Sequence, residues 1–146
     1  MGARMVDRTP AQVYALLVGL ALLAGGVLGF FYSASFATGD AIEREAVLGI
    51  LDVNAWHNIV HITTGATALV VAGSYSTSRS FALALGAVYM LVAVIGFAVG
   101  DGEAIAGLVP VNTEDNVFHL LIAVSGLLAY AATPATPAPT TVVPST

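Results

Sequence analysis

The stretch FALALGAVYMLVAVIGFAV, residues 81–99, decides the class of this protein, because it contains no charged side chain. A helix that crosses the hydrocarbon core of a bilayer needs about 20 consecutive apolar residues. Three further segments have a similar character, at about residues 11–33, 55–73 and 115–132. The sequence therefore predicts an all-α fold, an integral membrane four-helix bundle.

The composition of the whole chain agrees with a membrane protein. Of its 146 residues, 58% are hydrophobic and 9% are charged, whereas soluble domains carry about 25% charged residues. The absence of cysteine excludes disulfides and thiolate metal sites. The four arginines form no basic run, so the sequence predicts no nucleic-acid binding. The predicted partner is the lipid bilayer, and a second copy or another membrane protein is left open.

The arginines predict the orientation in the membrane. Arg4 and Arg8 precede the first predicted span, and Arg79 stands between the second and the third. The loop before the second span carries Arg44 among four acidic residues, and the loop before the fourth is acidic with no base. Because basic residues favour the cytoplasmic side, both termini are predicted to lie in the cytoplasm of a multi-pass cell-membrane protein.

The predicted membrane domain spans residues 1–132, and the remainder forms a tail. The tail, TPATPAPTTVVPST at 133–146, has four prolines and no charge, which predicts disorder. Three glycines of the first span form a face for close helix packing, and we expect that face to be used within the chain; they are Gly25, Gly26 and Gly29.

The chain repeats itself. VLGILDVNAWHNIVH at 47–61 aligns with IAGLVPVNTEDNVFH at 105–119, an offset of 58 residues. Upstream, VLGF at 27–30 resembles VIGF at 94–97, so the first outer loop is longer, and its extra TGDAIEREA predicts a short helix. We expect two parallel helical hairpins related by a pseudo-twofold axis along the membrane normal. The aligned polar pairs are Asn54 with Asn112, His57 with Asp115, Asn58 with Asn116, and His61 with His119.

The leading interpretation of this polar cluster is structural. On a helix, His57, Asn58 and His61 fall on one face that continues through small residues, as do Asp115, Asn116 and His119. Small residues mark where membrane helices approach closely, so both faces point into the bundle. Asn58, His61, Asn116 and His119 would then form a polar lock near the outer face of a non-enzymatic membrane protein. Catalysis has little support, because neither a nucleophile–base arrangement nor a phosphate loop is present.

The alternative interpretation is a metal or haem site in a redox-associated membrane subunit. His57 with His61 and Asp115 with His119 have the i, i+4 spacing of two helical ligands to one ion. Three imidazoles and a carboxylate suit zinc, copper or iron. Asn58 and Asn116 would orient the rings, or His61 and His119 would hold a haem as axial ligands. No feature of the sequence demands a cofactor. Proton or solute transport is a third interpretation, but the first and third spans carry no acidic, basic or histidine residue to extend a relay.

The repeated motifs also carry a family resemblance. GILDVN at 49–54 followed by HNIVH at 57–61, and GLVPVN at 107–112 followed by DNVFH at 115–119, resemble two signatures of the prokaryotic membrane family called domain of unknown function 4383. The resemblance covers roughly residues 10–132, and Asn58, His61, Asn116 and His119 match signature positions. It implies a four-span integral membrane protein. It implies no activity, because the role of that family is not established.

Overall fold

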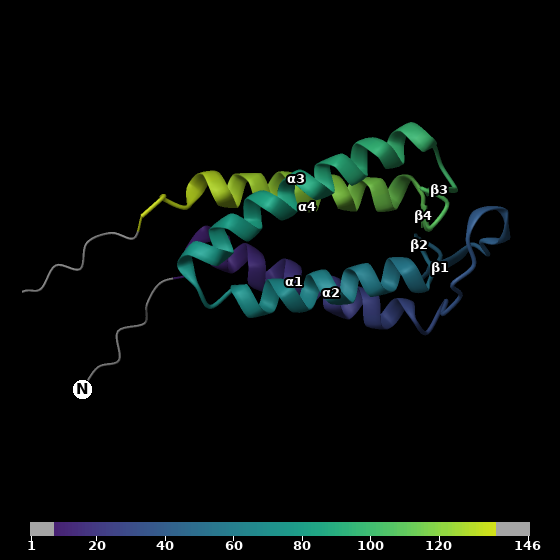
Figure 1. Cartoon of the computed structure of the whole chain (residues 1–146), viewed down its shortest axis with the longest axis horizontal. Helices are drawn as coiled ribbons and strands as arrows, with labels where there is room; N and C mark the ends of the chain where they lie inside the picture. The colour runs from purple at the N-terminus through teal and green to yellow at the C-terminus, as the bar shows by residue number, and fades with distance from the viewer. Residues whose placement is uncertain (1–7, 137–146) are drawn as a thin grey trace, which may run out of the picture.

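The computed structural model describes residues 8–136, and this part of the chain forms four α-helices with two short β-hairpins (Figure 1). The predicted all-α four-helix fold is confirmed. The helices are α1 (Pro10–Gly29), α2 (Ala55–Val71), α3 (Tyr75–Val99) and α4 (Thr113–Ala132). A 3-10 turn, η1 (Gly39–Ala41), precedes the first hairpin, and the strands are β1 (Glu45–Val47), β2 (Leu51–Val53), β3 (Glu103–Ile105) and β4 (Val109–Val111).

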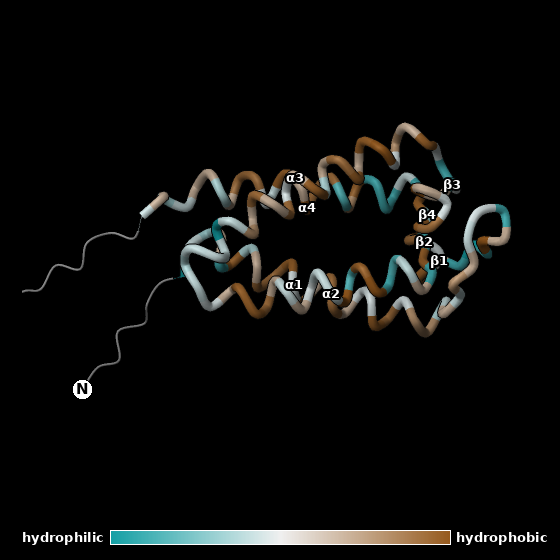
Figure 2. The backbone as a smooth tube through the Cα atoms, in the orientation of Figure 1, coloured by the Kyte–Doolittle hydropathy of each residue, from teal (hydrophilic) through white to brown (hydrophobic). Residues whose placement is uncertain are grey.

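Three of these helices, α1, α3 and α4, are long and apolar enough to cross a membrane. Apolar residues colour much of the helices brown in Figure 2. α2 has 17 residues and is the shortest of the four, so its crossing stays a prediction. α1 ends at Gly29 rather than near 33, and α3 begins at Tyr75, which places Arg79 inside a helix rather than in a turn. The predicted tail lies outside the described residues from position 137 onward.

The helices pack mainly in two pairs, α1 with α2 and α3 with α4 (Figure 1). Glycines allow the close approach that membrane helices need. A β-carbon added to Gly26 would lie 2.6 Å from the Asn58 carbonyl oxygen, and one on Gly65 would lie 2.5 Å from the Leu23 nitrogen. The glycine face of α1 is therefore used inside the chain, as expected, except at Gly25, where an added β-carbon would meet nothing within 4 Å.

The start of α1 and the end of α4 lie together at one end of the bundle, called here the terminal end (left in Figure 1). Thr133 joins three helices there. Its hydroxyl oxygen accepts from the Ala11 amide at 2.9 Å, and its carbonyl oxygen accepts from Arg79 Nε at 2.8 Å. The Arg79 guanidinium also lies 4.0 Å from the centre of the Tyr130 ring. Arg79 thus caps the carboxyl end of α4 in addition to carrying charge.

The opposite, hairpin end is built from two antiparallel ribbons that the sequence did not predict. β1 pairs with β2 and β3 with β4. Both ribbons turn through two residues at positive φ, Leu48 and Gly49 (54° and 70°) and Ala106 and Gly107 (52° and 67°). Two successive residues at positive φ are typical of a type I′ turn, which matches the twist of a β-hairpin. The predicted helix at TGDAIEREA is limited to η1, and β1 begins at the last glutamate of this stretch, Glu45.

Candidate functional site

Asn54 and Asn112 connect the two helical pairs at the hairpin end. Each is the N-cap of its helix, and its side-chain oxygen accepts from the third backbone N–H of that helix, at 2.9 and 2.8 Å. The amide nitrogen of Asn54 donates to the Leu108 carbonyl at 2.6 Å, and that of Asn112 donates to the Ile50 carbonyl at 2.7 Å. These reciprocal bonds, called here the asparagine clasp, join residues that correspond at the offset of 58. A parallel repeat predicts such reciprocity, so the clasp supports the predicted duplication without establishing it.

The asparagines of the Asn-x-x-His motifs face the partner helix of their own pair. Asn58 and Asn116 are buried, and Asn58 Nδ2 donates to the Ser33 carbonyl at 2.9 Å. The Asn58 side chain lies against Gly29, and the Asn116 side chain lies in the same way against Gly96, where an added β-carbon would collide with each amide oxygen. Neither asparagine makes a hydrogen bond to a histidine ring among the described residues. The motif is therefore divided, with asparagine and histidine on different interfaces.

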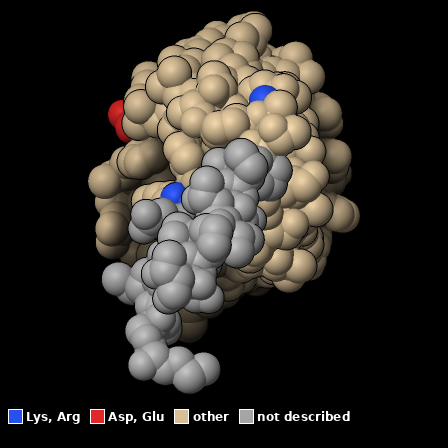
Figure 3. Space-filling view, turned by 90° about the vertical axis from the view of Figure 1, so that its left-hand side faces the viewer, with Lys and Arg blue, Asp and Glu red and all other residues tan. Residues whose placement is uncertain are grey.

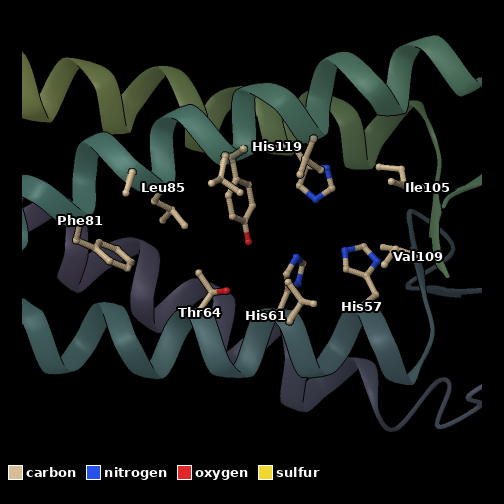
Figure 4. A pocket seen from close by; sticks show the side chains of 13 residues that line it. His57, His61, Thr64, Phe81, Leu85, Ile105, Val109 and His119 are labelled. Carbon is tan, nitrogen blue, oxygen red and sulfur yellow. The ribbon is translucent and has the colours of Figure 1, made fainter.

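The three histidines converge between the helical pairs. Each of His57, His61 and His119 offers a ring nitrogen that lies within 4.8 Å of the others, and this set is called here the histidine cluster. The ring centres lie 4.4 Å apart for His57 and His61, 5.8 Å for His57 and His119, and 6.2 Å for His61 and His119. Figure 4 shows His57 and His61 extending from α2 toward His119 of α4. Three of the four ligands predicted from the sequence, His57, His61 and His119, thus lie close together in the structure.

Two of these rings are buried with a nitrogen that makes no hydrogen bond among the described residues, Nε2 of His57 and Nδ1 of His119. His57 Nδ1 lies 2.9 Å from the Asp52 carbonyl oxygen. A carbonyl only accepts, so this contact fixes the proton on Nδ1 and leaves the lone pair on Nε2. Buried polar atoms without a partner are uncommon in folded proteins, and here two of them belong to the histidine cluster.

Asp115, the fourth predicted ligand, is not part of the histidine cluster. Its Oδ2 accepts from the Asp52 amide at 2.9 Å and from the Asn112 amide at 3.2 Å. It thereby completes a capping box at the start of α4 and joins that helix to β2. The carboxylate serves backbone N–H groups, and the predicted set of four ligands is reduced to three.

The side chain of Asp52 borders the same region from β2. It is buried, and its Oδ1 accepts from Asn112 Nδ2 at 3.2 Å. Burial raises the pKa of Asp52 above its ordinary value, and the negative charges of Asp101 and Glu114 add to the rise. The hydrogen bond from Asn112 and the positive charge of Arg44 oppose it. The acidic form of this carboxyl is therefore favoured by its surroundings.

A cavity of about 370 Å³ lies beside the histidine cluster between α2 and α3, and is called here the cleft (Figure 4). Its wall is apolar apart from the histidines, Thr64 and Tyr89. Tyr89 is buried, its hydroxyl has no hydrogen-bond partner among the described residues, and its ring centre lies 5.4 Å from that of His119. The lining residues are His57, Val60, His61, Thr64, Phe81, Ala84, Leu85, Val88, Tyr89, Val92, Ile105, Val109 and His119.

Sequence reasoning missed Tyr89 but placed Thr64 on the same helix face as His57 and His61. A signal for Tyr89 was present, because it is the one polar side chain in the stretch 81–99. Thr64 lies about one turn beyond His61 on the same side of α2. The helical period therefore predicts that Thr64 lies on the side of the histidines.

The family comparison agrees with the motifs. The sequence model of the family described as Domain of unknown function (DUF4383) matches residues 12–132. The chain belongs to this family. No curated protein and no solved structure matches the chain. Family membership therefore assigns no activity to the histidine cluster.

Proposed function

We propose that this membrane protein binds a transition-metal ion through His57, His61 and His119. The observation that carries the proposal is the approach of three ring nitrogens to within 4.8 Å of one another, at a place where two buried nitrogens lack partners among the described residues. A metal ion would provide the missing partner for both. Three neutral imidazoles suit Zn²⁺ or Cu²⁺, which are commonly bound by histidine nitrogen.

The surroundings of His57 favour metal binding. The Asp52 carbonyl at 2.9 Å holds the proton on Nδ1 and leaves the lone pair of Nε2 available to a metal ion. In metalloproteins a histidine ligand usually donates its other N–H to such an oxygen, which fixes the orientation of the ring. A site with three protein ligands keeps one position open, and the side of the cluster without protein ligands is the cleft.

A haem fits this arrangement less well than a single ion. The ring centres of His61 and His119 are 6.2 Å apart, but the ring of His57 lies 4.4 Å from the first and 5.8 Å from the second. A porphyrin between two axial rings needs the plane around the iron to be free. The ring of His57 occupies part of the space beside that plane.

A structural lock is the second candidate, favoured by one specific observation. Asn54, Asn58 and Asn112 all make hydrogen bonds between elements distant in sequence. In this alternative the histidines would fill space between the helical pairs and bind nothing. The described histidine side chains make no hydrogen bond to one another, which favours a site over a lock for the histidines and leaves locking to the asparagines.

We infer that the protein has the orientation predicted from its sequence, with the terminal end in the cytoplasm. Arg8 and Arg79 lie at the terminal end, whose surface is seen in Figure 3, and most of the acidic residues belong to the loops of the hairpin end. The excess of basic residues supports a cytoplasmic terminal end. His61 and His119 each lie six residues into their helices, which is about 9 Å at 1.5 Å per residue. The metal would then be held near the outer face of the membrane.

The test is elemental analysis of protein purified in detergent, without chelators and without a polyhistidine tag, after supply of Zn²⁺ or Cu²⁺. We expect about one metal ion per chain, and loss of the metal in His57→Ala and His119→Ala. Asp115→Asn is the matched control, because its oxygen accepts from backbone amides and the metal should be retained. Absence of metal from the wild type would overturn the proposal and leave the structural lock. Loss of metal in Asp115→Asn alone would replace the three-ligand site with a different one.

A further inference from the structure

The rim of the cleft includes exposed apolar side chains of α2 and α3. Its walls come from α2, α3 and α4 and are closed at the hairpin end by Ile105 and Val109. At its rim, Val60 of α2 is 48% exposed and Val88 of α3 is 54% exposed. These two residues lie on the sides of the two helices, where the acyl chains of a bilayer would lie. The direct route into the cleft is therefore from the membrane.

The histidines of the cleft gather at one end. The histidine cluster lies toward the hairpin end, while Phe81 and Leu85 line the other end (Figure 4). The ring centre of Tyr89 lies 5.4 Å from that of His119. The volume of about 370 Å³ falls in the range of about 300–1,000 Å³ that is typical of small-molecule pockets. Such a site suits an elongated molecule with an apolar body and a small polar head.

Tyr89 defines the chemistry of that head. Its hydroxyl is a donor without an acceptor among the described residues, on a side chain that is only 4% exposed. A buried hydroxyl without a partner is costly, so an oxygen acceptor on a ligand would satisfy it. The residue that corresponds to Tyr89 in α1, at the offset of 67, is Leu22, and the α1–α4 side of the bundle is joined by a hydrogen bond from Tyr14 to the Ile122 carbonyl at 2.9 Å. Tyr89 therefore has no tyrosine counterpart at the aligned position of α1.

We infer that the cleft binds a membrane-dissolved molecule of the quinone class, with a carbonyl oxygen as its head and a hydrocarbon body. This inference rests on the proposed function, because the open position of the metal faces the cleft. The head oxygen accepts from the Tyr89 hydroxyl and lies at the open side of the histidine cluster. The body lies against Phe81 and Leu85 and leaves between α2 and α3.

The experiment uses decylubiquinone as the probe and the fluorescence of the single tryptophan as the signal. Trp56 precedes His57 in α2, and a quinone bound in the cleft would quench it. Binding is measured in detergent on metal-loaded protein, with the metal content of each sample determined. Decylbenzene, which lacks oxygen, competes in a second series.

Two variants and a control separate specific binding from partition into detergent. Ala84→Phe, at the exposed rim, should fill the cleft and weaken binding at least tenfold. Tyr89→Phe, which removes only the hydroxyl, should weaken it roughly threefold to tenfold, the range expected for one hydrogen bond. Val70→Phe changes a side chain that is 81% exposed on α2 and should leave binding unchanged.

Each result is decisive. Loss in Ala84→Phe and weakening in Tyr89→Phe, with Val70→Phe unchanged, would support the inference. Equal quenching in all variants that contain metal would overturn the inference and leave the metal site standing. Competition by decylbenzene as strong as that by the quinone would overturn the head-group assignment and make a hydrocarbon chain the occupant. Absence of metal from the wild type would overturn the proposed function, and this inference with it.

Discussion

Replacing Gly29 with alanine should unfold the α1–α2 pair more readily, whereas the same change at Gly25 should not. A β-carbon at position 29 would collide with the Asn58 amide oxygen. The Asn58 side chain is 0% exposed and has no free space to move into without losing its bond to the Ser33 carbonyl. At Gly25 the same carbon would meet nothing within 4 Å.

The magnitude follows from two costs. An unpaired buried amide costs about 1–3 kcal/mol, and forcing an extra carbon into a packed interior costs about 1–3 kcal/mol. The better helix propensity of alanine returns roughly 0.5–1 kcal/mol. Gly29→Ala should therefore lower the free energy of unfolding by about 1–5.5 kcal/mol, and Gly25→Ala should raise it slightly.

The assay is unfolding of both variants in mixed detergent micelles, followed by far-ultraviolet circular dichroism. Pairing Gly29→Ala with Asn58→Ala gives a second check. Alanine at position 58 removes the amide that the new carbon strikes, so the double variant should be no less stable than Asn58→Ala alone. If Gly29→Ala proved as stable as Gly25→Ala, or if the two losses added in full, the proposed collision with Asn58 would be refuted.

Three further predictions concern the ends of the bundle. Arg79→Gln removes the cap on α4 and the contact with the Tyr130 ring. It should lower the free energy of unfolding by about 1–2 kcal/mol. An unchanged unfolding midpoint in detergent would argue against the cap. Asn54→Ala and Asn112→Ala should each lower the free energy of unfolding by about 1–3 kcal/mol. A much smaller loss for one of them would mean that the two halves of the asparagine clasp do not contribute equally to stability. Because burial raises the pKa of Asp52, the folded state holds that proton more tightly than the unfolded state, so the contribution of Asp52 to stability should grow as pH falls from neutral toward the ordinary carboxyl value of 3.8. Asp52→Asn should raise the unfolding temperature at neutral pH and reduce that gain, and an identical pH profile would contradict the assignment.

The sequence predicted the four helices because long apolar runs leave few other structures in a membrane. It placed their ends less well. α3 extends back to Tyr75 through serine and threonine residues, which the hydrophobic pattern does not register but which hydrogen-bond readily within a helix. The two β-ribbons were missed because their strands are three residues long and their turns use Leu48–Gly49 and Ala106–Gly107, weaker signals than Asn-Gly.

The candidate site was predicted in part. The i, i+4 spacing brought His57 and His61 together, and the repeat added His119. The same spacing pointed to Asp115, but its carboxylate accepts from the backbone amides of Asp52 and Asn112. A signal for its actual role was present: an acidic residue three positions after Asn112 is typical of a capping box. The separate interfaces of Asn58 and the histidines could not be read from helical angles alone, since those angles do not say where the neighbouring helices lie.

The pairing of the helices also sets an order for folding. α1 with α2, and α3 with α4, are neighbours in sequence and make the largest share of contacts, and local contacts form fastest. In a membrane, helices insert before they associate, so each pair would assemble before the two pairs meet. The histidine cluster is divided between the pairs, with His119 on one and His57 and His61 on the other. The site is thus completed only in the last step of assembly, and an ion that bridges the three rings would stabilise the final state and slow its dissociation into two folded halves.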